Sequence, residues 1–210
     1  RARSDSSEAT LLTGSQLNGQ NIDLRAGTDL TVEASSLRAE ETARLMAGQD
    51  INIVTANEYQ SSSSSRETSK LGLSFNAATG VSASSTEKYQ QSRFERADAV
   101  GSQLSAESLI LSSGRDTAIE GSTLVADDAI SIAAGRDLLI TSAQSHETTS
   151  SQSSSRKVGD VGEWYQPSYG RAKQSQSETV SSTRQVGSQI AALGGDISLS
   201  SGNRYQQTAS

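Results

Sequence analysis

The sequence predicts an all-β fold in which short parallel strands wind into a coil, a β-helix solenoid, and two long β-hairpins extrude from that coil. Three observations predict this fold class. The chain repeats with a long period, each long period contains a shorter strand–turn–strand repeat, and a long Ser-rich insertion follows each pair of short repeats. Only 33% of the 210 residues are hydrophobic and 4% are aromatic, which is little material for a conventional globular core.

The long repeat is visible as a recurring tetrapeptide. Gly14-Ser15-Gln16-Leu17 returns 87 residues later as Gly101-Ser102-Gln103-Leu104, and 86 residues after that as Gly187-Ser188-Gln189-Ile190. Self-similarity at a fixed period is the sequence signature of folds built from stacked repeats. The rest of the chain is therefore best aligned on this period.

The short repeat consists of an alternating apolar pair, a Gly-x-Asp turn and a second alternating apolar pair. Its four copies occupy 22–32, 43–53, 109–119 and 130–140. Alternation with a period of two marks strands with one buried face. A unit of this size cannot bury its inward side chains alone, so the copies must stack as rungs of a solenoid. In that register one column of inward side chains is formed by Leu24, Leu45, Leu111 and Ile132.

Glycine and aspartate recur at fixed places in the turns. Because glycine readily adopts positive φ, we expect at least some of the four turn glycines to do so, at equivalent bends: Gly27, Gly48, Gly114 and Gly135. Four carboxylates would stack as a ladder: Asp29, Asp50, Asp116 and Asp137. Calcium requires about six to eight oxygen ligands, which one Asp per rung does not supply, so hydrogen bonding to the backbone of its own turn is favoured. No metal or cofactor site is predicted.

The two insertions, 57–100 and 143–186, sit at equivalent positions of the long repeat. Loops of this length are uncommon, so each is either an ordered hairpin or a disordered tether. The alternation of Leu71, Leu73 and Phe75 favours a hairpin, whereas the Ser-rich arms resemble flexible linkers. Symmetric hairpins would turn at 78–79 and 164–165, and we expect the two to pair with each other as antiparallel strands, because a lone hairpin is only marginally stable.

These boundaries divide the chain into six segments. The last of them contains Gly202-Asn203-Arg204, which lacks the turn Asp, so the repeat pattern gives no support for a complete rung there. The segments are 1–13, the end of a preceding extrusion; 14–56, two rungs; 57–100, a hairpin; 101–142, two rungs; 143–186, a hairpin; and 187–210, the start of the next rung or rungs.

Composition excludes several classes of function. The formal net charge is -6 without a basic tract, which argues against nucleic acid as a partner, and there is no cysteine. The charge lies mainly on the rungs, since the first insertion is neutral and the second carries +1. No apolar run approaches the ~20 residues of a membrane span. The chain begins at Arg1 with no initiator methionine or signal peptide, and we expect it to be cut from something longer.

An enzyme of the β-helix type, such as a polysaccharide lyase or glycosidase, is the alternative. Such enzymes need paired carboxylates or a clustered base. Asp127-Asp128 and Glu40-Glu41 are adjacent pairs that would point to opposite faces of a strand, and the single histidine, His146, lies in a Ser/Thr-rich arm. No catalytic residue is predicted.

Aromatic residues near the second hairpin turn are the candidate partner-binding residues. Trp164, Tyr165 and Tyr169 combine a large apolar surface with a polar group, as residues at protein interfaces often do. Alternatively, they cover a rung or stack on the neighbouring hairpin. The sequence leaves both interpretations open.

The turn motifs resemble those of a known family. Gly14-Ser15-Gln16-Leu17, together with Ala26-Gly27-Thr28-Asp29-Leu30, Ala47-Gly48-Gln49-Asp50-Ile51 and Ala134-Gly135-Arg136-Asp137-Leu138, is similar to the haemagglutinin repeats of filamentous haemagglutinins. The paired rungs with Ser-rich insertions resemble in particular the second repeat region of contact-dependent growth inhibition effectors.

This resemblance implies a right-handed parallel β-helix in a filament that is secreted or displayed on the surface of a Gram-negative cell. Export would use two-partner secretion through an outer-membrane transporter. The implied role is adhesion or delivery of a C-terminal toxin, with this region meeting the target-cell surface or outer membrane.

Overall fold

The protein is all-β in a computed structural model that describes residues 1–76, 80–160 and 169–208. Within these ranges the regular structure consists of strands, and there is no helix with the length and apolar character of a membrane span. The strands fall into two compact units, which we call the hairpin sheet and the coil. The hairpin sheet comprises Arg1–Ala9, Tyr59–Arg96 and Glu147–Ser182, and the coil comprises Thr10–Glu58, Ala97–His146 and Thr183–Ser210.

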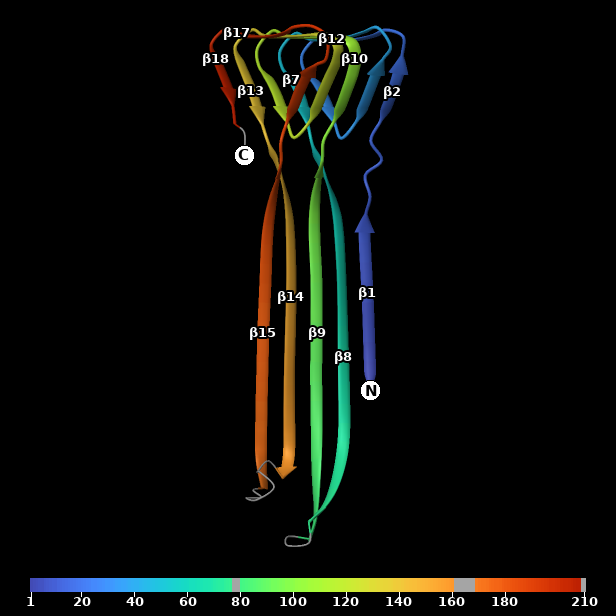
Figure 1. The fold of residues 1–210 in the computed structure, drawn as a ribbon, viewed down its shortest axis with the longest axis vertical. Helices are drawn as coiled ribbons and strands as arrows, with labels where there is room; N and C mark the ends of the chain where they lie inside the picture. Colours follow the sequence, from blue (N-terminus) through green and yellow to red (C-terminus); the bar gives the residue numbers. More distant parts are fainter. Residues whose placement is uncertain (77–79, 161–168, 209–210) are drawn as a thin grey trace. The chain divides into compact units, whose positions relative to one another are not determined.

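The coil has five successive rungs among the described residues, and each contains three strand segments (Figure 1). In rungs 3 and 4 the first two segments are continuous as one long strand. Rungs 1 and 2 consist of β2 (Gln16–Gly19), β3 (Ile22–Ala26) and β4 (Leu30–Glu33), then β5 (Ser36–Ala39), β6 (Thr42–Ala47) and β7 (Ile51–Val54). Rungs 3 to 5 consist of β10 (Gln103–Ser113) and β11 (Thr117–Glu120), then β12 (Thr123–Ala134) and β13 (Asp137–Thr141), then β16 (Gln189–Ala192), β17 (Ile197–Ser201) and β18 (Arg204–Gln207).

Strands of neighbouring rungs pair in parallel. One sheet joins the first and second segments of the rungs, and the other joins the third segments in the order β4-β7-β11-β13-β18. The register pairs Leu45 with both Leu24 and Leu111, and it pairs Leu111 with Ile132. Each inward side chain therefore packs on the equivalent side chain one rung away, about 4.8 Å along the stack.

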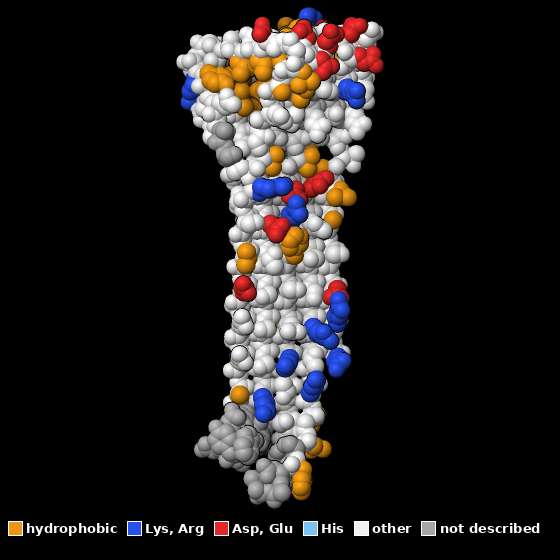
Figure 2. Space-filling view, viewed as in Figure 1, with side chains coloured by type: hydrophobic (Ala, Val, Ile, Leu, Met, Phe, Trp, Pro, Cys, Tyr) orange, Lys and Arg blue, Asp and Glu red, His pale blue; other side chains and the backbone are white. Residues whose placement is uncertain are grey.

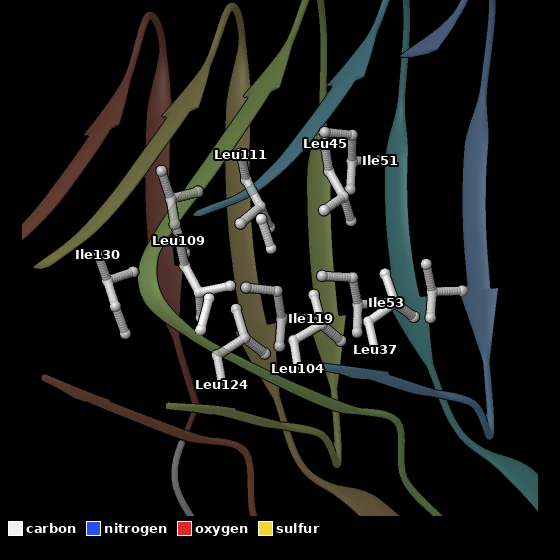
Figure 3. Packing of buried hydrophobic residues seen from close by; sticks show 14 of the residues in the cluster. Leu37, Leu45, Ile51, Ile53, Leu104, Leu109, Leu111, Ile119, Leu124 and Ile130 are labelled. Carbon is white, nitrogen blue, oxygen red and sulfur yellow. The ribbon is translucent and has the colours of Figure 1, made fainter. Parts of the chain in front are cut away.

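The hydrophobic core of the coil lies between its strands. Alternate residues of β6, β7 and β10 point inward, so that Leu45, Ile51, Ile53, Leu109 and Leu111 are fully buried. Figure 3 shows these side chains converging from both sheets. Burial of this kind contributes roughly 1.5–3 kcal/mol per side chain, which compensates for the low hydrophobic content of the whole chain.

The first strand of each rung was not part of the predicted strand–turn–strand unit. It begins within the tetrapeptide motif: β2 contains Leu17, and β10 pairs through Leu104 with Leu37 and Leu124. The repeat is thus three-stranded, because the apolar residue of the motif also faces the core.

A complete fifth rung forms although its turn lacks the expected Asp. Arg204 takes the equivalent position opposite Asp137, and Tyr205 pairs with Leu138. The backbone N–H of Arg204 donates to Asp137 Oδ1 (3.1 Å), and Asn203 Nδ2 donates to the same atom (2.8 Å). The bond to the preceding rung needs only a backbone N–H from the fifth rung, so arginine at this position does not break it.

The expectation of positive φ at the turn glycines was wrong. Among the described residues, positive φ occurs at Ala34 (43°), Gly121 (52°) and Gly159 (124°). The turn glycines are needed for another reason: a Cβ on Gly114 would lie 2.2 Å from the carbonyl oxygen of Gly48, and one on Gly48 would lie 2.1 Å from that of Gly27. The rungs stack backbone on backbone at this corner, and a side chain would force them apart.

The corner at the tetrapeptide motif holds a column of buried serines. Ser102 is fully buried, and its hydroxyl lies within hydrogen-bonding distance of the carbonyl oxygens of Val54 (3.0 Å) and Val32 (3.1 Å). The Ser102 N–H in turn donates to Ser122 Oγ (3.1 Å). The single hydroxyl proton is donated to one of these carbonyl groups at a time, and the Val54 carbonyl also accepts from the N–H of Ala34 (3.2 Å). Leaving a buried polar group at this corner unpaired would cost about 1–3 kcal/mol.

The hairpin sheet has five strands in the order β1-β8-β9-β14-β15, which is also their order along the chain. Figure 1 shows neighbouring strands of this sheet running in opposite directions. The Ser-rich arms are thus paired strands and not flexible tethers, and the two insertions pair with each other through β9 and β14. The predicted turn positions lie outside the described residues. The strands are β1 (Ala2–Thr10), β8 (Ala56–Asn76), β9 (Gly80–Val100), β14 (Ala143–Asp160) and β15 (Tyr169–Val186).

Candidate binding surface

The hairpin sheet carries an exposed apolar stripe on β8. Leu71, Leu73 and Phe75 are 83%, 78% and 79% exposed. Because alternate residues of a strand point to the same side, the three side chains share one face of the sheet. Figure 2 shows hydrophobic side chains at the end of the hairpin sheet where β8 ends. A contiguous exposed row of this kind, unlike a single exposed leucine, marks an interaction surface.

Cationic side chains cross the same sheet. Lys88, Arg156 and Lys173 line a shallow cavity of about 200 Å³ on β9, β14 and β15, together with Glu67 and Glu87. Figure 2 shows further Lys and Arg side chains along this sheet.

The sequence ranges of the two units differ in charge. Those of the hairpin sheet contain 11 Lys and Arg against 9 Asp and Glu, whereas those of the coil contain 7 against 15. An anionic surface is therefore attracted to the hairpin sheet more than to the coil.

Two other shallow cavities of the hairpin sheet are lined mainly by polar residues, among them several serines. One, of about 380 Å³, includes Arg93, Phe94 and Asp5; the other, of about 450 Å³, includes Arg3 and Arg66. Hydroxyl and guanidinium groups of this kind can hydrogen-bond polar ligands. Asp5 is the one carboxylate among the lining residues of these two cavities, so neither holds the pair of carboxylates that glycoside hydrolysis requires.

The adjacent carboxylates of the coil lie at a corner and not in a cleft. Asp127 and Asp128 fall at a register shift of β12 against β10, and both are exposed. Glu41 accepts hydrogen bonds from Asn21 Nδ2 (2.9 Å) and Gln20 Nε2 (2.8 Å), which lower its pKa from the ordinary value. No three His, Cys, Asp or Glu side chains are grouped to hold a metal ion in the parts of the chain that the structure describes.

The aspartates of the turns form a ladder, but each bonds to the next rung and not to its own turn. Asp50 N–H donates to Asp29 Oδ1 (3.1 Å), Asp116 N–H to Asp50 Oδ1 (3.1 Å) and Asp137 N–H to Asp116 Oδ1 (3.2 Å). Arg136 Nε also donates to Asp116 Oδ1 (2.8 Å). That hydrogen bond, with the backbone N–H of Asp137, lowers the pKa of Asp116. The ladder is a structural element that joins rungs.

The predicted aromatic residues contribute nothing to the described surface. Trp164 and Tyr165 lie outside the described residues; Tyr169 begins β15, but its side chain is likewise outside them. The predicted inward column is buried at Leu45, Leu111 and Ile132, while Leu24 in the end rung is half-buried.

Two features of the structure were not predicted from the sequence: the exposed apolar stripe and the column of buried serines. The alternation of Leu71, Leu73 and Phe75 predicts a strand with one buried face, but it does not predict that this face is exposed. The serine column was overlooked although Gly-Ser-x-Leu recurs at Gly101 and Gly121. Its role depends on contacts between rungs, which a single repeat does not reveal.

A coil of stacked rungs whose sequence also carries long hairpins defines a repeat protein. The chain belongs to the hemagglutinin repeat family, whose sequence model matches residues 1–157.

Among its relatives, a protein of Yersinia mollaretii described as tRNA nuclease CdiA is 33% identical over 60% of this chain and 4% of its own length. A tRNA nuclease CdiA of Escherichia coli is 27% identical over 70% of this chain and 5% of its own. A tRNA nuclease CdiA-2 of Burkholderia pseudomallei is 25% identical over 91% of this chain and 6% of its own. The chain thus spans only a small part of the curated relatives it matches. No solved structure matches it.

Proposed function

We propose that this chain is a structural repeat segment of a large filamentous protein, secreted or displayed on the surface of a Gram-negative bacterium through an outer-membrane transporter. In this proposal the coil is a right-handed parallel β-helix that serves as a rod. The segments 14–56 and 101–142 are its paired rungs, and 57–100 and 143–186 are its hairpins. Membership in the hemagglutinin repeat family and the similarity to CdiA proteins support this role.

The hairpin sheet is the functional surface in this proposal. It contacts the target-cell surface or outer membrane, in adhesion or during delivery of a toxin carried by the parent protein. The observation that carries the proposal is the stripe of Leu71, Leu73 and Phe75, each about four-fifths exposed. Burying three such side chains is worth roughly 5–9 kcal/mol before entropic costs, at about 1.5–3 kcal/mol each.

The positive side chains of the hairpin sheet also favour its contact with a membrane. Lys88, Arg156 and Lys173 lie on the same sheet and can approach lipid phosphates. The aromatic residues Trp164, Tyr165 and Tyr169, near the predicted turn of the second hairpin, have the composition of an interfacial anchor and belong to this proposed surface. No cofactor or metal is required.

Vesicle flotation tests the proposal. The chain is mixed with vesicles of phosphatidylethanolamine and lipopolysaccharide, and wild type is compared with a variant carrying Leu71→Ser, Leu73→Ser and Phe75→Ser. We expect at least tenfold weaker binding by the variant. A matched control, Leu11→Ser, Val180→Ser and Leu193→Ser, removes three exposed apolar side chains elsewhere and should bind like wild type. Vesicle binding by the stripe variant equal to that of wild type would show that the stripe does not contribute to membrane contact.

A further inference from the structure

The hairpin sheet alternates two kinds of strand. β8 and β14 are outgoing arms that follow rungs 2 and 4, and β9 and β15 are returning arms that end immediately before Gly101 and Gly187. β1 ends shortly before Gly14 of the same motif, which makes it a returning arm as well. Along the sheet the order is therefore returning, outgoing, returning, outgoing, returning.

The two outgoing arms are equivalent in sequence. Lys70-Leu71-Gly72 in β8 recurs 87 residues later as Lys157-Val158-Gly159 in β14, in step with the long repeat. Gly159 packs against the returning arm of the preceding hairpin, because a Cβ there would lie 2.5 Å from the carbonyl oxygen of Ala83 in β9. β14 thus lies closely against a returning arm of another hairpin at Gly159, whereas a Cβ on the equivalent Gly72 of β8 would lie 3.1 Å from Ser84 Oγ in its own hairpin.

We infer that the free edge of β15 is a docking edge for the outgoing arm of a further repeat, so that hairpins of successive repeats form one continuous antiparallel sheet. β15 stands at the end of the sheet and pairs only with β14 among the described residues. In this structure β1 and β9 each pair with the outgoing arm of the next hairpin, β8 and β14. β15, the third returning arm, has the same position in its repeat.

The character of this edge supports docking. Residues 171–185 are all exposed and lie in a strand without proline or positive φ, so the strand presents a long, regular row of backbone groups. Such an edge is a template for another strand.

A second copy of this chain has no outgoing arm at either edge of its described hairpin sheet. The other end of the sheet is β1, which is also a returning arm and runs in the same direction as β15 (Figure 1). Joining β15 to β1 of another copy would place two returning arms side by side and break the alternation. The alternation of the sheet therefore favours an outgoing arm as the occupant.

Hydrogen–deuterium exchange of the whole chain tests this. A synthetic peptide with the sequence of residues 143–160 is added, and a scrambled peptide of the same composition is the control. We expect the outgoing-arm peptide to slow exchange at alternate amides of residues 171–185 at least tenfold, and the scrambled peptide to have no effect. Absence of protection in β15, equal protection by both peptides, or a dimer already protecting β15 without peptide would overturn the inference.

Two proline variants provide an independent check. In a strand, alternate N–H groups point to opposite edges, so Ser175→Pro with Ser177→Pro and Gln176→Pro with Glu178→Pro affect opposite edges of β15. One variant should keep the β14–β15 pairing but lose the peptide, while the other disrupts that pairing. If both variants keep β14–β15 paired and still bind the peptide as wild type does, the edge is not the site.

Discussion

The backbone N–H of Asp116 donates a 3.1 Å hydrogen bond to Asp50 Oδ1, across 66 residues of sequence. Asp50 belongs to rung 2 and Asp116 to rung 3, and the first hairpin lies between them in the chain. The same bond joins Asp137 to Asp116, which are only 21 residues apart. A long insertion therefore leaves the stacking of the rungs unchanged, and this allows the coil to carry hairpins.

Asp116 should make the coil sensitive to acid. The hydrogen bond from Arg136 holds the pKa of Asp116 below its ordinary value of 3.8. Because the pKa of Asp116 is lower in the folded state, its stabilising effect is fully present at pH values above the ordinary pKa of 3.8. That effect is lost as the pH falls through the folded-state pKa. We expect Asp116→Asn to lower the melting temperature at pH 7 and to flatten its fall between about pH 5 and 2.

Arg136→Gln is the matched variant for this prediction. Removing the guanidinium should bring the pKa of Asp116 back toward its ordinary value, so that this carboxyl contributes less pH dependence and the fall in melting temperature with acid is flatter than in wild type. Melting temperatures measured by circular dichroism from pH 2 to 7 provide the comparison. If the melting temperatures of wild type and both variants fell with pH in parallel, the hydrogen bond between Arg136 and Asp116 would not be the cause of the acid sensitivity.

The stacked glycines should tolerate no side chain inside the coil. Gly114→Ala places a Cβ 2.2 Å from the carbonyl oxygen of Gly48, and we expect a loss of about 1–3 kcal/mol in the free energy of unfolding. Gly27→Ala is the control, because nothing lies within 4 Å of its Cβ. Urea unfolding should show a near-neutral effect there. Equal destabilisation at both positions would mean that conformation and not close stacking selects glycine.

Buried serine should matter more than its small size suggests. Ser102→Ala removes the hydroxyl that donates to a carbonyl group of the rung corner, and we expect a cost of about 1–3 kcal/mol. Ser198→Ala, at an exposed position of β17, should change the free energy of unfolding by less than about 0.5 kcal/mol. Similar values for the two variants would show that the serine column does not stabilise the coil.

Inward leucines should contribute according to their depth in the stack. Leu111 is fully buried between Leu45 and Ile132, so Leu111→Ala should cost about 2–5 kcal/mol. Leu24 is half-buried in the end rung, and Leu24→Ala should cost clearly less. A larger loss of unfolding free energy for Leu24→Ala than for Leu111→Ala would contradict the stacking of these side chains in one buried column.

Sequence periodicity was sufficient to predict the β class and the repeat, because alternation at Leu109 and Leu111 or at Ile51 and Ile53 reports directly on burial. It could not predict why Gly114 is glycine, since the reason is a carbonyl group one rung away. The direction of the Asp50 hydrogen bond depends on the same stacking.

The candidate surface was harder to predict. Leu71, Leu73 and Phe75 have the pattern of a strand buried on one face, and sequence alone does not reveal that these side chains are exposed. The aromatic candidates were chosen by residue type and predicted position at a turn, and Trp164 and Tyr165 lie outside the described residues.

In the proposed function the coil is a rod and the hairpin sheet is the surface that meets the target cell. The most direct test of this proposal is a competition assay in a parent protein that carries this segment, with surface display measured by immunoblot of intact cells. Serine at positions 71, 73 and 75 should leave display at the wild-type level and reduce toxin delivery into target cells at least tenfold. Delivery at the wild-type level by this variant, at equal display, would contradict the proposal and leave the hairpins as spacers.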